Sequence, residues 1–413
     1  MKETKNVPQL RFSGFDDEWE EKKLNEYLEP SKQKNLDNKY SKNDVLSVSG
    51  EFGIVNQIEF QGRSFAGEYV NNYGVVETND IVYTKSPLNA NPYGIIKSNF
   101  GKTGIVSTLY AVYKSKNNVD PCFIQTYFDL NKRLNDYLRP LVRKGAKNDM
   151  KVSSEDALLG NVVFPSKLEQ QKIGAFLSHV DSLIQAKTKK LESLKAIKKS
   201  LLQKCFPKAG EKVPEIRFAG FSGDWEEKKL GEIAVFSKGH GYSKNDLIPD
   251  GDPIILYGRM YTNYETVISN IETFVHKQEN SVLSKGGEII IPASGETAED
   301  IARASVVEKK GIILGGDINI VSLPKTVYDP SFVALSVSHG ESQKELCQNA
   351  QGKTIVHLHN DDIRKISILF PSLTEQQKIG QFFSKYDSLI SVQQKEIDKL
   401  KYIKKSLLQK MFI

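Results

Sequence analysis

Two long segments of the chain place their apolar residues at helical spacing. Residues 168–205 contain no proline, and their apolar side chains recur in steps of three and four. Residues 374–412 repeat this pattern. Such spacing forms one apolar stripe along a helix. Each segment therefore predicts a helix of about 38 residues and about 57 Å. Two such stripes most simply bury each other as a coiled coil.

The stretches between these helices, residues 25–163 and 231–369, have a different pattern. Short apolar runs such as Gly104–Val112 and Gly311–Val321 alternate with Gly, Asn and Pro. This alternation indicates many short strands joined by turns. Together with its amino-terminal block, each stretch predicts a mixed α/β globule of about 160 residues, which is large enough to bury a core.

The ends of the two globules repeat at a constant offset of 206 residues. Residues 7–24 match residues 213–230 at 12 of 18 positions, and residues 164–206 match residues 370–412 at 27 of 43 positions. The two middles show little similarity. The chain is therefore a tandem duplication, in which the matching ends do one job twice and the middles do different jobs on a common scaffold.

Charge is concentrated on the two predicted helices. The chain has 57 Lys and Arg against 51 Asp and Glu, a net charge of +6. Residues 167–204 carry +6 and residues 373–410 carry +4, so the rest of the chain sums to −4. Lysine-rich helices are either simply well solvated or lie near a phosphate backbone or an acidic partner.

Composition excludes several classes of protein. The chain is 39% hydrophobic and 26% charged, as soluble globular proteins are, and no apolar run is long enough to cross a membrane. No apolar segment follows Met1–Lys5, so we expect no secretory signal. Three widely spaced cysteines favour a reducing compartment. We therefore expect a cytoplasmic protein.

The sequence contains no convincing catalytic motif. Gly101-Lys102-Thr103 and Gly352-Lys353-Thr354 lack the upstream glycine of a phosphate-binding loop. Asn91–Gly94 resembles the base-gripping loop of amino-methyltransferases but has only one of its two prolines. His357 and His359 have no Cys or acidic residue at metal-ligand spacing. We expect no catalytic residue, metal or cofactor in this chain.

These features together resemble the specificity subunits of Type I restriction–modification systems. The resemblance covers essentially the whole chain. It rests on the paired Phe-Pro-Ser-x-x-Glu-Gln-Gln-Lys-Ile-Gly segments, at residues 164–174 and 370–380, and on the paired Pro-x-x-Arg-Phe-x-Gly-Phe…Trp segments, at residues 8–19 and 214–225. The 206-residue duplication adds to both.

The resemblance implies an α+β fold. Two mixed α/β target recognition domains would be separated by two long antiparallel helices that form a coiled coil, with an internal pseudo-twofold repeat. The domains would be residues 1–163 and 207–369, and the conserved helices residues 164–206 and 370–413. Each domain would recognise one half of a bipartite, asymmetric target in double-stranded DNA, and the helices would fix the spacer between the halves.

The resemblance also implies the partners. Two modification subunits would dock at the conserved regions and methylate adenine with S-adenosylmethionine. Restriction subunits, which act as motor and nuclease with ATP and magnesium, would complete the complex. The chain itself would hold no active site.

We predict DNA contacts from exposed-looking loops rich in cations, amides and aromatic residues. In the first domain these are Lys85, Ser86, Asn89, Asn91, Tyr93, Arg143, Lys144, Lys147 and Asn148. In the second they are Lys238, His240, Tyr242, Lys244, Tyr257, Arg259, Tyr261, Lys353 and Thr354. For each of them a solvated loop is the alternative. Trp19 and Trp225 are expected to anchor each domain to its helix.

A second set of residues is predicted to form the helix pair or to contact partner subunits. It comprises Glu169, Gln170, Ile173, Leu177, Val180, Ile184, Glu375, Gln376, Ile379, Phe383, Tyr386 and Ile390. Two other functions remain open on the sequence: a non-catalytic coiled-coil adaptor with incidental DNA contact, and a stand-alone DNA-modifying enzyme.

Overall fold

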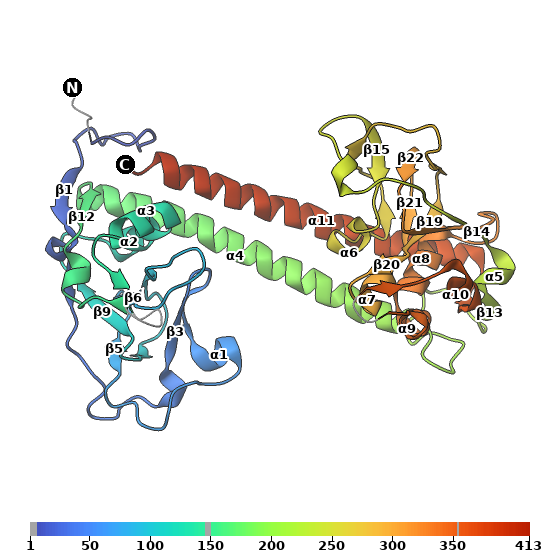
Figure 1. The fold of residues 1–413 in the computed structure, drawn as a ribbon. Coiled ribbons are helices and arrows are strands. Elements are labelled where there is room, and N and C mark those ends of the chain that lie inside the picture. The colour runs from blue at the N-terminus through green and yellow to red at the C-terminus, as the bar shows by residue number, and fades with distance from the viewer. Residues whose placement is uncertain (1–5, 145–149, 353–354) are drawn as a thin grey trace. The chain divides into compact units, whose positions relative to one another are not determined.

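The computed structural model describes residues 6–144, 150–352 and 355–413. It divides into two compact units (Figure 1). Unit 1 comprises Met1–Lys187 and Glu396–Ile413, and unit 2 comprises Thr188–Lys395. The two predicted long helices are present as α4 (Lys167–Lys204) and α11 (Leu373–Lys410), each of 38 residues. Each of them begins in one unit and ends in the other.

Unit 1 is a mixed α/β globule, as its sequence predicts. Its central sheet has the order β2-β9-β6-β7 and is antiparallel throughout. Smaller pairs are β1 with β12, β3 with β4, β5 with β8 and β10 with β11. The strands are β1 (Glu20–Lys23), β2 (Leu28–Pro30), β3 (Leu46–Ser49), β4 (Gly53–Asn56), β5 (Gly74–Val76), β6 (Ile81–Thr84), β7 (Ile96–Ser98), β8 (Gly104–Val106), β9 (Tyr110–Ser115), β10 (Arg143–Lys144), β11 (Met150–Lys151) and β12 (Asn161–Phe164). The helices are α1 (Gln57–Gln61), α2 (Pro121–Phe128) and α3 (Asn131–Leu138).

Unit 2 is also mixed but has larger sheets. One has the order β14-β23-β19-β21-β16 and the other β17-β15-β22-β18. The strands are β13 (Glu226–Lys229), β14 (Val235–Lys238), β15 (Asp252–Ile255), β16 (Val267–Ile268), β17 (Phe274–Val275), β18 (Leu283–Lys285), β19 (Glu288–Pro292), β20 (Ser294–Gly295), β21 (Ser305–Val307), β22 (Lys310–Leu314), β23 (Ile318–Ser322), β24 (Val356–His357) and β25 (Ser367–Phe370). The helices are α5 (Leu230–Ile233), α6 (Arg259–Thr262), α7 (Ala298–Ile301), α8 (Pro330–Ser338), α9 (Gly340–Asn349) and α10 (Asn360–Lys365).

The repeated sequence blocks form the same local structure in both units. Strand β1 pairs with β12 through Glu20↔Phe164, and β13 pairs with β25 through Glu226↔Phe370. The repeated Asp-Pro dipeptides stand at the starts of α2 and α8. The Asp120 and Asp329 carboxylates accept the amide N–H of the third residue that follows, at 3.0 and 2.9 Å, and so cap α2 and α8. The common part of each unit is therefore the frame around the start of its long helix.

The end of each long helix is buried in the unit where the other long helix begins. In unit 1, Leu408, Met411 and Phe412 at the end of α11 join the core that also holds Ile173 and Leu177 of α4. In unit 2, Leu202, Cys205 and Phe206 at the end of α4 join the core that holds the start of α11. Neither core is complete without the helix that comes from the other copy of the repeat.

The two tryptophans occupy the centre of these contacts. Trp19 is 2% exposed and Trp225 is 1% exposed, so their predicted core position is confirmed. Trp19 meets the ring of Phe412 with 6.1 Å between centroids, and Trp225 meets Phe206 at the same separation. Each tryptophan therefore contacts the end of the helix that begins in the other unit. The sequence alone predicts that each tryptophan anchors its domain to the helix of its own repeat.

We predict that Phe412→Ala destabilises unit 1 selectively. The Phe412 side chain also contacts Phe123 and Tyr127, and removing a buried phenyl ring costs about 3–5 kcal/mol. Hydrogen exchange should show faster opening of unit 1 amides and unchanged unit 2 amides. The control is Tyr402→Ala on the same helix, where the side chain is 74% exposed. Equal loosening of both units by Phe412→Ala would contradict the assignment.

Candidate nucleic-acid interface

The start of each long helix is fixed by a buried ion pair. The Arg11 guanidinium donates to both carboxylate oxygens of Glu169 at 2.7 and 2.8 Å. Arg217 donates to Glu375 in the same bidentate way, at 2.8 Å for both bonds. The glutamate side chains are each 1% exposed. The hydrogen bond to Glu169 raises the pKa of Arg11, and the bond to Glu375 raises the pKa of Arg217.

The neighbouring glutamines complete the same anchor. The Gln170 amide accepts the Asp120 N–H at 3.0 Å and donates to the Pro165 carbonyl at 2.9 Å. Gln376 makes the equivalent bonds to Asp329 and Pro371 at the same distances. The Glu-Gln pair thus ties each helix start to the amino-terminal segment and to the turn before α2 or α8.

These contacts locate the residues predicted for the helix pair or for partner contact. Glu169, Gln170, Glu375 and Gln376 bond within their own units rather than between α4 and α11. Ile173, Leu177, Ile379 and Phe383 lie in the cores. Val180, Ile184, Tyr386 and Ile390 are half-buried further along the helices.

Ion pairs between α4 and α11 exist within each unit. In unit 1, Lys404 pairs with Asp181 at 2.7 Å and Lys187 pairs with Glu396 at 2.6 Å. From Asp181 to Lys187 the residue number on α4 rises, while the residue number of the partner on α11 falls from 404 to 396. The two helices therefore run antiparallel in unit 1. In unit 2, Lys198 pairs with Asp387. Lys198 corresponds to Lys404 and Asp387 corresponds to Asp181 at the 206-residue offset, so the same ion pair occurs in both units.

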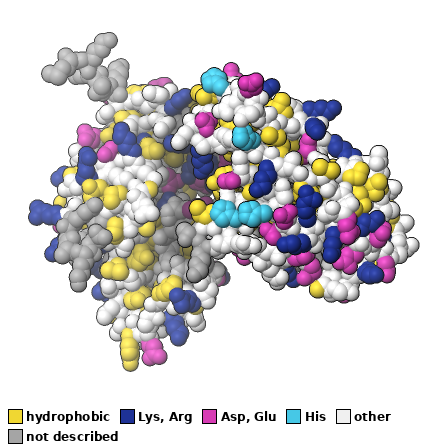
Figure 2. All heavy atoms as spheres, turned by 45° about the vertical axis from the view of Figure 1, so that its right-hand side comes forward, with side chains coloured by type: hydrophobic (Ala, Val, Ile, Leu, Met, Phe, Trp, Pro, Cys, Tyr) yellow, Lys and Arg dark blue, Asp and Glu magenta, His cyan; other side chains and the backbone are white. Residues whose placement is uncertain are grey.

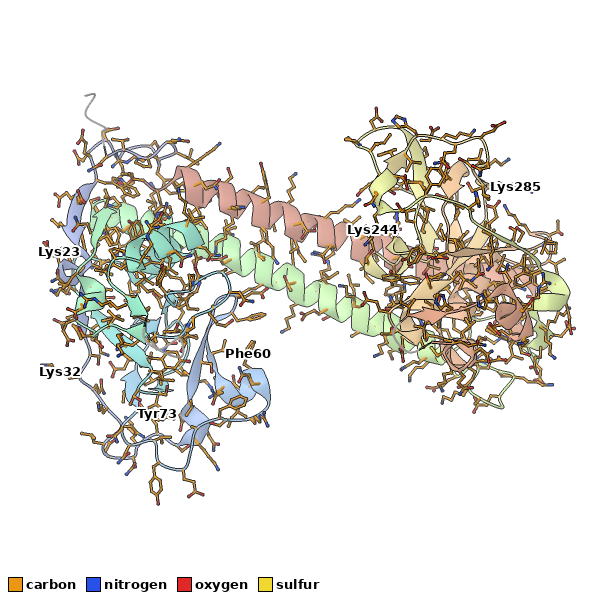
Figure 3. All side chains as sticks on the ribbon, in the orientation of Figure 1. Lys23, Lys32, Phe60, Tyr73, Lys244 and Lys285 are labelled. Carbon is orange, nitrogen blue, oxygen red and sulfur yellow. The ribbon has the colours of Figure 1, made fainter. Side chains whose placement is uncertain are left out.

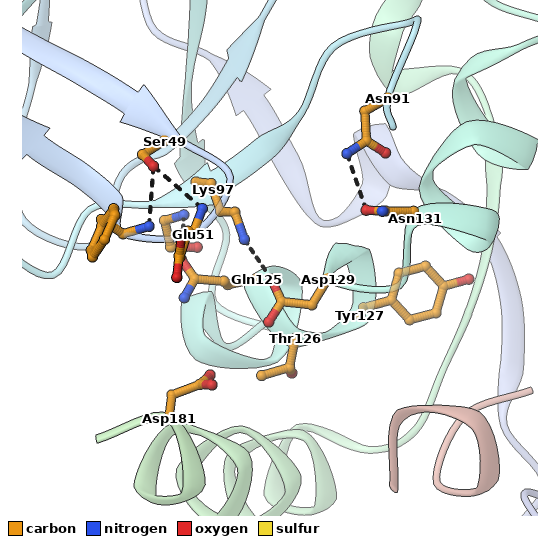
Figure 4. Close-up of polar contacts among 12 residues, drawn as sticks. Ser49, Glu51, Asn91, Lys97, Gln125, Thr126, Tyr127, Asp129, Asn131 and Asp181 are labelled. Atoms are coloured by element: carbon orange, nitrogen blue, oxygen red, sulfur yellow. Dashed lines mark hydrogen bonds and ion pairs between the residues drawn. The ribbon is translucent and has the colours of Figure 1, made fainter. Parts of the chain in front are cut away.

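The two units differ in the residue at the end of the helix beside this ion pair. In unit 1, Asp129 at the end of α2 accepts from Lys97 at 2.6 Å (Figure 4). It also accepts from Lys404 at 2.7 Å. Burial opposes ionisation of Asp129, but the two lysines lower its pKa below the usual value. In unit 2, the end of α8 carries His339 instead. Burial, with Lys198 and Arg303 nearby, lowers the pKa of His339 to about 4.

The first predicted DNA loop lies directly after β6. Ser86 and Asn89 are exposed, and Lys85 is half-buried, with its pKa lowered by burial. Asn91 is buried and donates to the Asn131 side chain at 3.0 Å (Figure 4). The Tyr93 carbonyl accepts the Tyr83 hydroxyl at 2.7 Å. The structure therefore gives Asn91 an internal partner, which favours a structural role over base contact for this residue.

Two residues of the second predicted basic turn of unit 1 lie on β10. Arg143 is exposed on β10 and pairs in register with Lys151 of β11. Lys144 follows it on β10. Lys147 and Asn148 lie outside the described residues. For this turn the DNA role stays a prediction.

In unit 2, Lys238 ends β14 and residues 239–243 form the loop that follows it. Lys238, His240 and Lys244 are exposed, and Tyr242 is half-buried. Lys244 lies on the segment before β15 (Figure 3). This loop contacts residues 276–281, a polar turn absent from the predicted set. Its His-Lys-Gln-Glu-Asn-Ser sequence has the right side chains, but only the fold brings it beside residue 240.

The other predicted residues of unit 2 lie on and before α6. The Tyr257 and Tyr261 rings are 6.2 Å apart between centroids. The Arg259 guanidinium pairs with Glu265 at 2.5 Å and donates to the Asn270 carbonyl at 3.1 Å. These bonds occupy Arg259 inside the unit. Lys353 and Thr354 lie outside the described residues.

The wider surface carries both signs of charge. In Figure 2, Lys and Arg side chains are interspersed with Asp and Glu on the visible face. In the described part of the chain, no group of three or more His, Cys, Asp or Glu residues could hold a metal ion. Likewise, no helix among the described residues is long and apolar enough to span a membrane.

Comparison with known proteins finds similarity to specificity subunits of Type I restriction enzymes. Residues 222–402 match the family described as the Type I restriction modification DNA specificity domain. The chain is 22% identical over 347 residues to the Type I restriction enzyme MjaVIII specificity subunit of Methanocaldococcus jannaschii, covering 81% of this chain and 78% of that one. It is 23% identical over 351 residues to the MjaIX specificity subunit of the same organism, covering 80% and 73%.

Solved structures agree on the fold. The crystal structure of the S subunit of a Type I restriction-modification system from M. genitalium matches with a TM-score of 0.63 at 14% identity, covering 98% of this chain and 99% of that one. The chain is thus similar in sequence and in fold to specificity subunits of Type I restriction–modification systems. The predicted resemblance to these subunits is confirmed.

We predict that His339 makes unit 2 sensitive to acid. Its folded-state pKa is about 4, below the ordinary value of 6.5, so the unfolded chain binds this proton more readily. Stability should therefore fall as the pH drops from 6.5 towards 4, by about 1–2 kcal/mol for a half-buried ring. His339→Asn should remove this part of the pH dependence in denaturation experiments. The exposed His276→Asn is the control, and an unchanged pH profile in His339→Asn would contradict the prediction.

Proposed function

We propose that this chain recognises a bipartite, asymmetric DNA target and directs Type I methyltransferase and restriction subunits to it. The observation that carries the proposal is the contrast between the repeated frame and the unlike sheets. The Arg-Glu anchors, the Trp contacts and the α4–α11 ion pairs recur at one offset. The sheets outside this frame differ in size and order. Two matching anchors that carry two different sheet domains suit a DNA target whose two halves differ.

The target recognition domains of this proposal are residues 1–163 and 207–369, with the conserved helices between and after them. Each domain would bind one half-site. The α4–α11 pair, as an antiparallel coiled coil with pseudo-twofold symmetry, would separate the domains and fix the spacer. Half-site spacing follows from protein geometry in the same way in other DNA-binding proteins.

Two identical modification subunits are the expected partners. A pseudo-twofold chain offers the same surface twice, and so suits two copies of one subunit. Exposed apolar residues support this, because several recur at the 206-residue offset. Val7 and Val213 are both 42% exposed, and Leu10 and Ile216 are 44% and 42% exposed. Exposed apolar side chains at matching places are typical of contact surfaces.

The chemistry would belong to the partners. In this proposal the modification subunits supply S-adenosylmethionine and methylate adenine, and the restriction subunits use ATP and magnesium. This chain would act as a non-catalytic subunit. A stand-alone enzyme would instead transfer methyl groups to DNA as a pure chain.

A non-catalytic adaptor that binds DNA only incidentally is the alternative. Specific recognition depends on contacts to base edges, whereas incidental binding depends on phosphate charge and falls steeply with salt. Binding of the reconstituted complex to duplexes of different sequence at raised salt distinguishes the two. Sequence preference that survives at high salt supports the proposal, and equal binding to all duplexes supports the adaptor.

We predict that exchanging residues 25–163 for the corresponding part of another specificity subunit changes only one half of the target. The boundaries leave the Arg11–Glu169 anchor and Trp19 in place, so the contact of Trp19 with Phe412 persists. Mapping methylated adenines with the exchanged complex measures the result. A change in both halves would contradict the assignment of one half-site to each domain.

We predict that lengthening both α4 and α11 by seven residues widens the spacer. Seven residues add about 10 Å of helix, which corresponds to about three base pairs at roughly 3.4 Å each. Insertions on the unit 2 side of Lys187 and the matching side of Glu396 preserve that ion pair. The spacer is measured from the methylated sites. An unaltered spacer in an active variant would refute the measuring role of the helices.

A further inference from the structure

Two loops of unit 2 are held together by close backbone contacts. The loop that follows β14 packs against the turn between β22 and β23. The Gly239 N–H donates to the Ile318 carbonyl at 2.9 Å, the His240 N–H donates to Leu314 at 3.1 Å, and the Gly316 N–H donates to Gly241 at 2.6 Å. A Cβ atom at position 239 would lie 2.0 Å from the Gly315 carbonyl oxygen, so only glycine permits this approach.

Tyr242 connects this loop to residues 276–281. Its φ of 61° lies in the left-handed region, which is costly for a tyrosine. In that conformation its hydroxyl accepts the Gln278 N–H at 2.8 Å and lies 2.5 Å from the Ser281 hydroxyl. The Ser281 hydroxyl also donates to the Gln278 carbonyl at 2.8 Å. The turn therefore has a defined position relative to residues 239–241.

This arrangement presents a pair of polar side chains on the surface. The Asn280 amide nitrogen lies 2.8 Å from the His240 Nε2, and both side chains are exposed. Lys244 and Lys277 on the same two loops are exposed too, and neither forms an ion pair with any described residue. The nearby acids Asp246, Asp252 and Glu279 are exposed as well. Of these, Asp246 accepts the Ser243 N–H and Asp252 accepts the Lys277 N–H.

The side-chain amide of Asn280 keeps one N–H donor and one oxygen acceptor that can bind adenine. If its Nδ2 donates one hydrogen to His240, the second hydrogen and Oδ1 remain available. These two point the same way and match the N7 acceptor and N6 donor that adenine presents in the major groove. His240 would fix the orientation of the amide, and Lys244 and Lys277 would neutralise flanking phosphates.

We propose that Asn280 recognises an adenine in the half-site bound by unit 2, with His240 as the residue that positions its amide. This inference rests on the proposed function, because it names the base and the side chain that recognise it. Lys244 and Lys277 contribute affinity for any sequence, whereas Asn280 contributes preference for one base at one position.

The test uses the full chain assembled with its modification subunits. Methylation rates are measured on duplexes in which each target position is varied singly, and on duplexes with 7-deazaadenine, which lacks N7, at each adenine. With Asn280→Ala we expect discrimination at one position of one half-site to fall by about 5- to 150-fold, the range of a good bidentate contact. In the unmodified chain, 7-deazaadenine at that position should slow methylation, and in Asn280→Ala it should cost nothing further.

Matched variants separate recognition from damage. Asn263→Ala removes an exposed asparagine of the same unit and should leave all preferences intact. His240→Ala should weaken discrimination at the same position while adenine stays the preferred base there. The half-site of unit 1 is the internal control throughout. Full discrimination in Asn280→Ala, or a change confined to the other half-site, overturns the inference. Absence of any half-site preference in the unmodified complex overturns the proposed function with it.

Discussion

Burial of each long-helix end beside the start of the other helix is the constraint on which the structure depends. Phe412 and Phe206 are the last aromatic residues of the two repeats, and both lie among aromatic rings of the unit they enter. Burying a phenyl ring contributes about 1.5–3 kcal/mol, and edge-to-face rings add to it. Each unit would therefore lose a substantial part of its small stability margin without the other copy's helix.

This constraint explains why the ends of the repeat stay alike while the middles diverge. The Arg11–Glu169 and Arg217–Glu375 pairs are buried, and removing one member of such a pair leaves an uncompensated charge at a cost of about 3–5 kcal/mol. Both members, and the glutamine beside each glutamate, must be kept together in both copies. The strands of the two recognition domains need only supply buried apolar residues, so their sequences and even their sheet orders can differ.

Sequence reasoning was strongest where periodicity or duplication carried the signal. Apolar spacing predicted both 38-residue helices closely. It could not predict that Phe412 meets Trp19 rather than Trp225, because both pairings satisfy the same pattern. Nor could it recognise that Asn91 bonds to Asn131 or that Asn280 meets His240. Those contacts join residues 40 apart in the chain and depend on how loops pack.

Dividing the chain in the Pro207–Lys212 segment and coexpressing the two parts tests the central claim most directly. If each long helix completes the core of the other unit, the parts should copurify in equal amounts, because each lacks the helix end that the other supplies. Phe206→Ala and Phe412→Ala together should weaken that association. Two parts that purify separately as stable folded monomers would contradict the account.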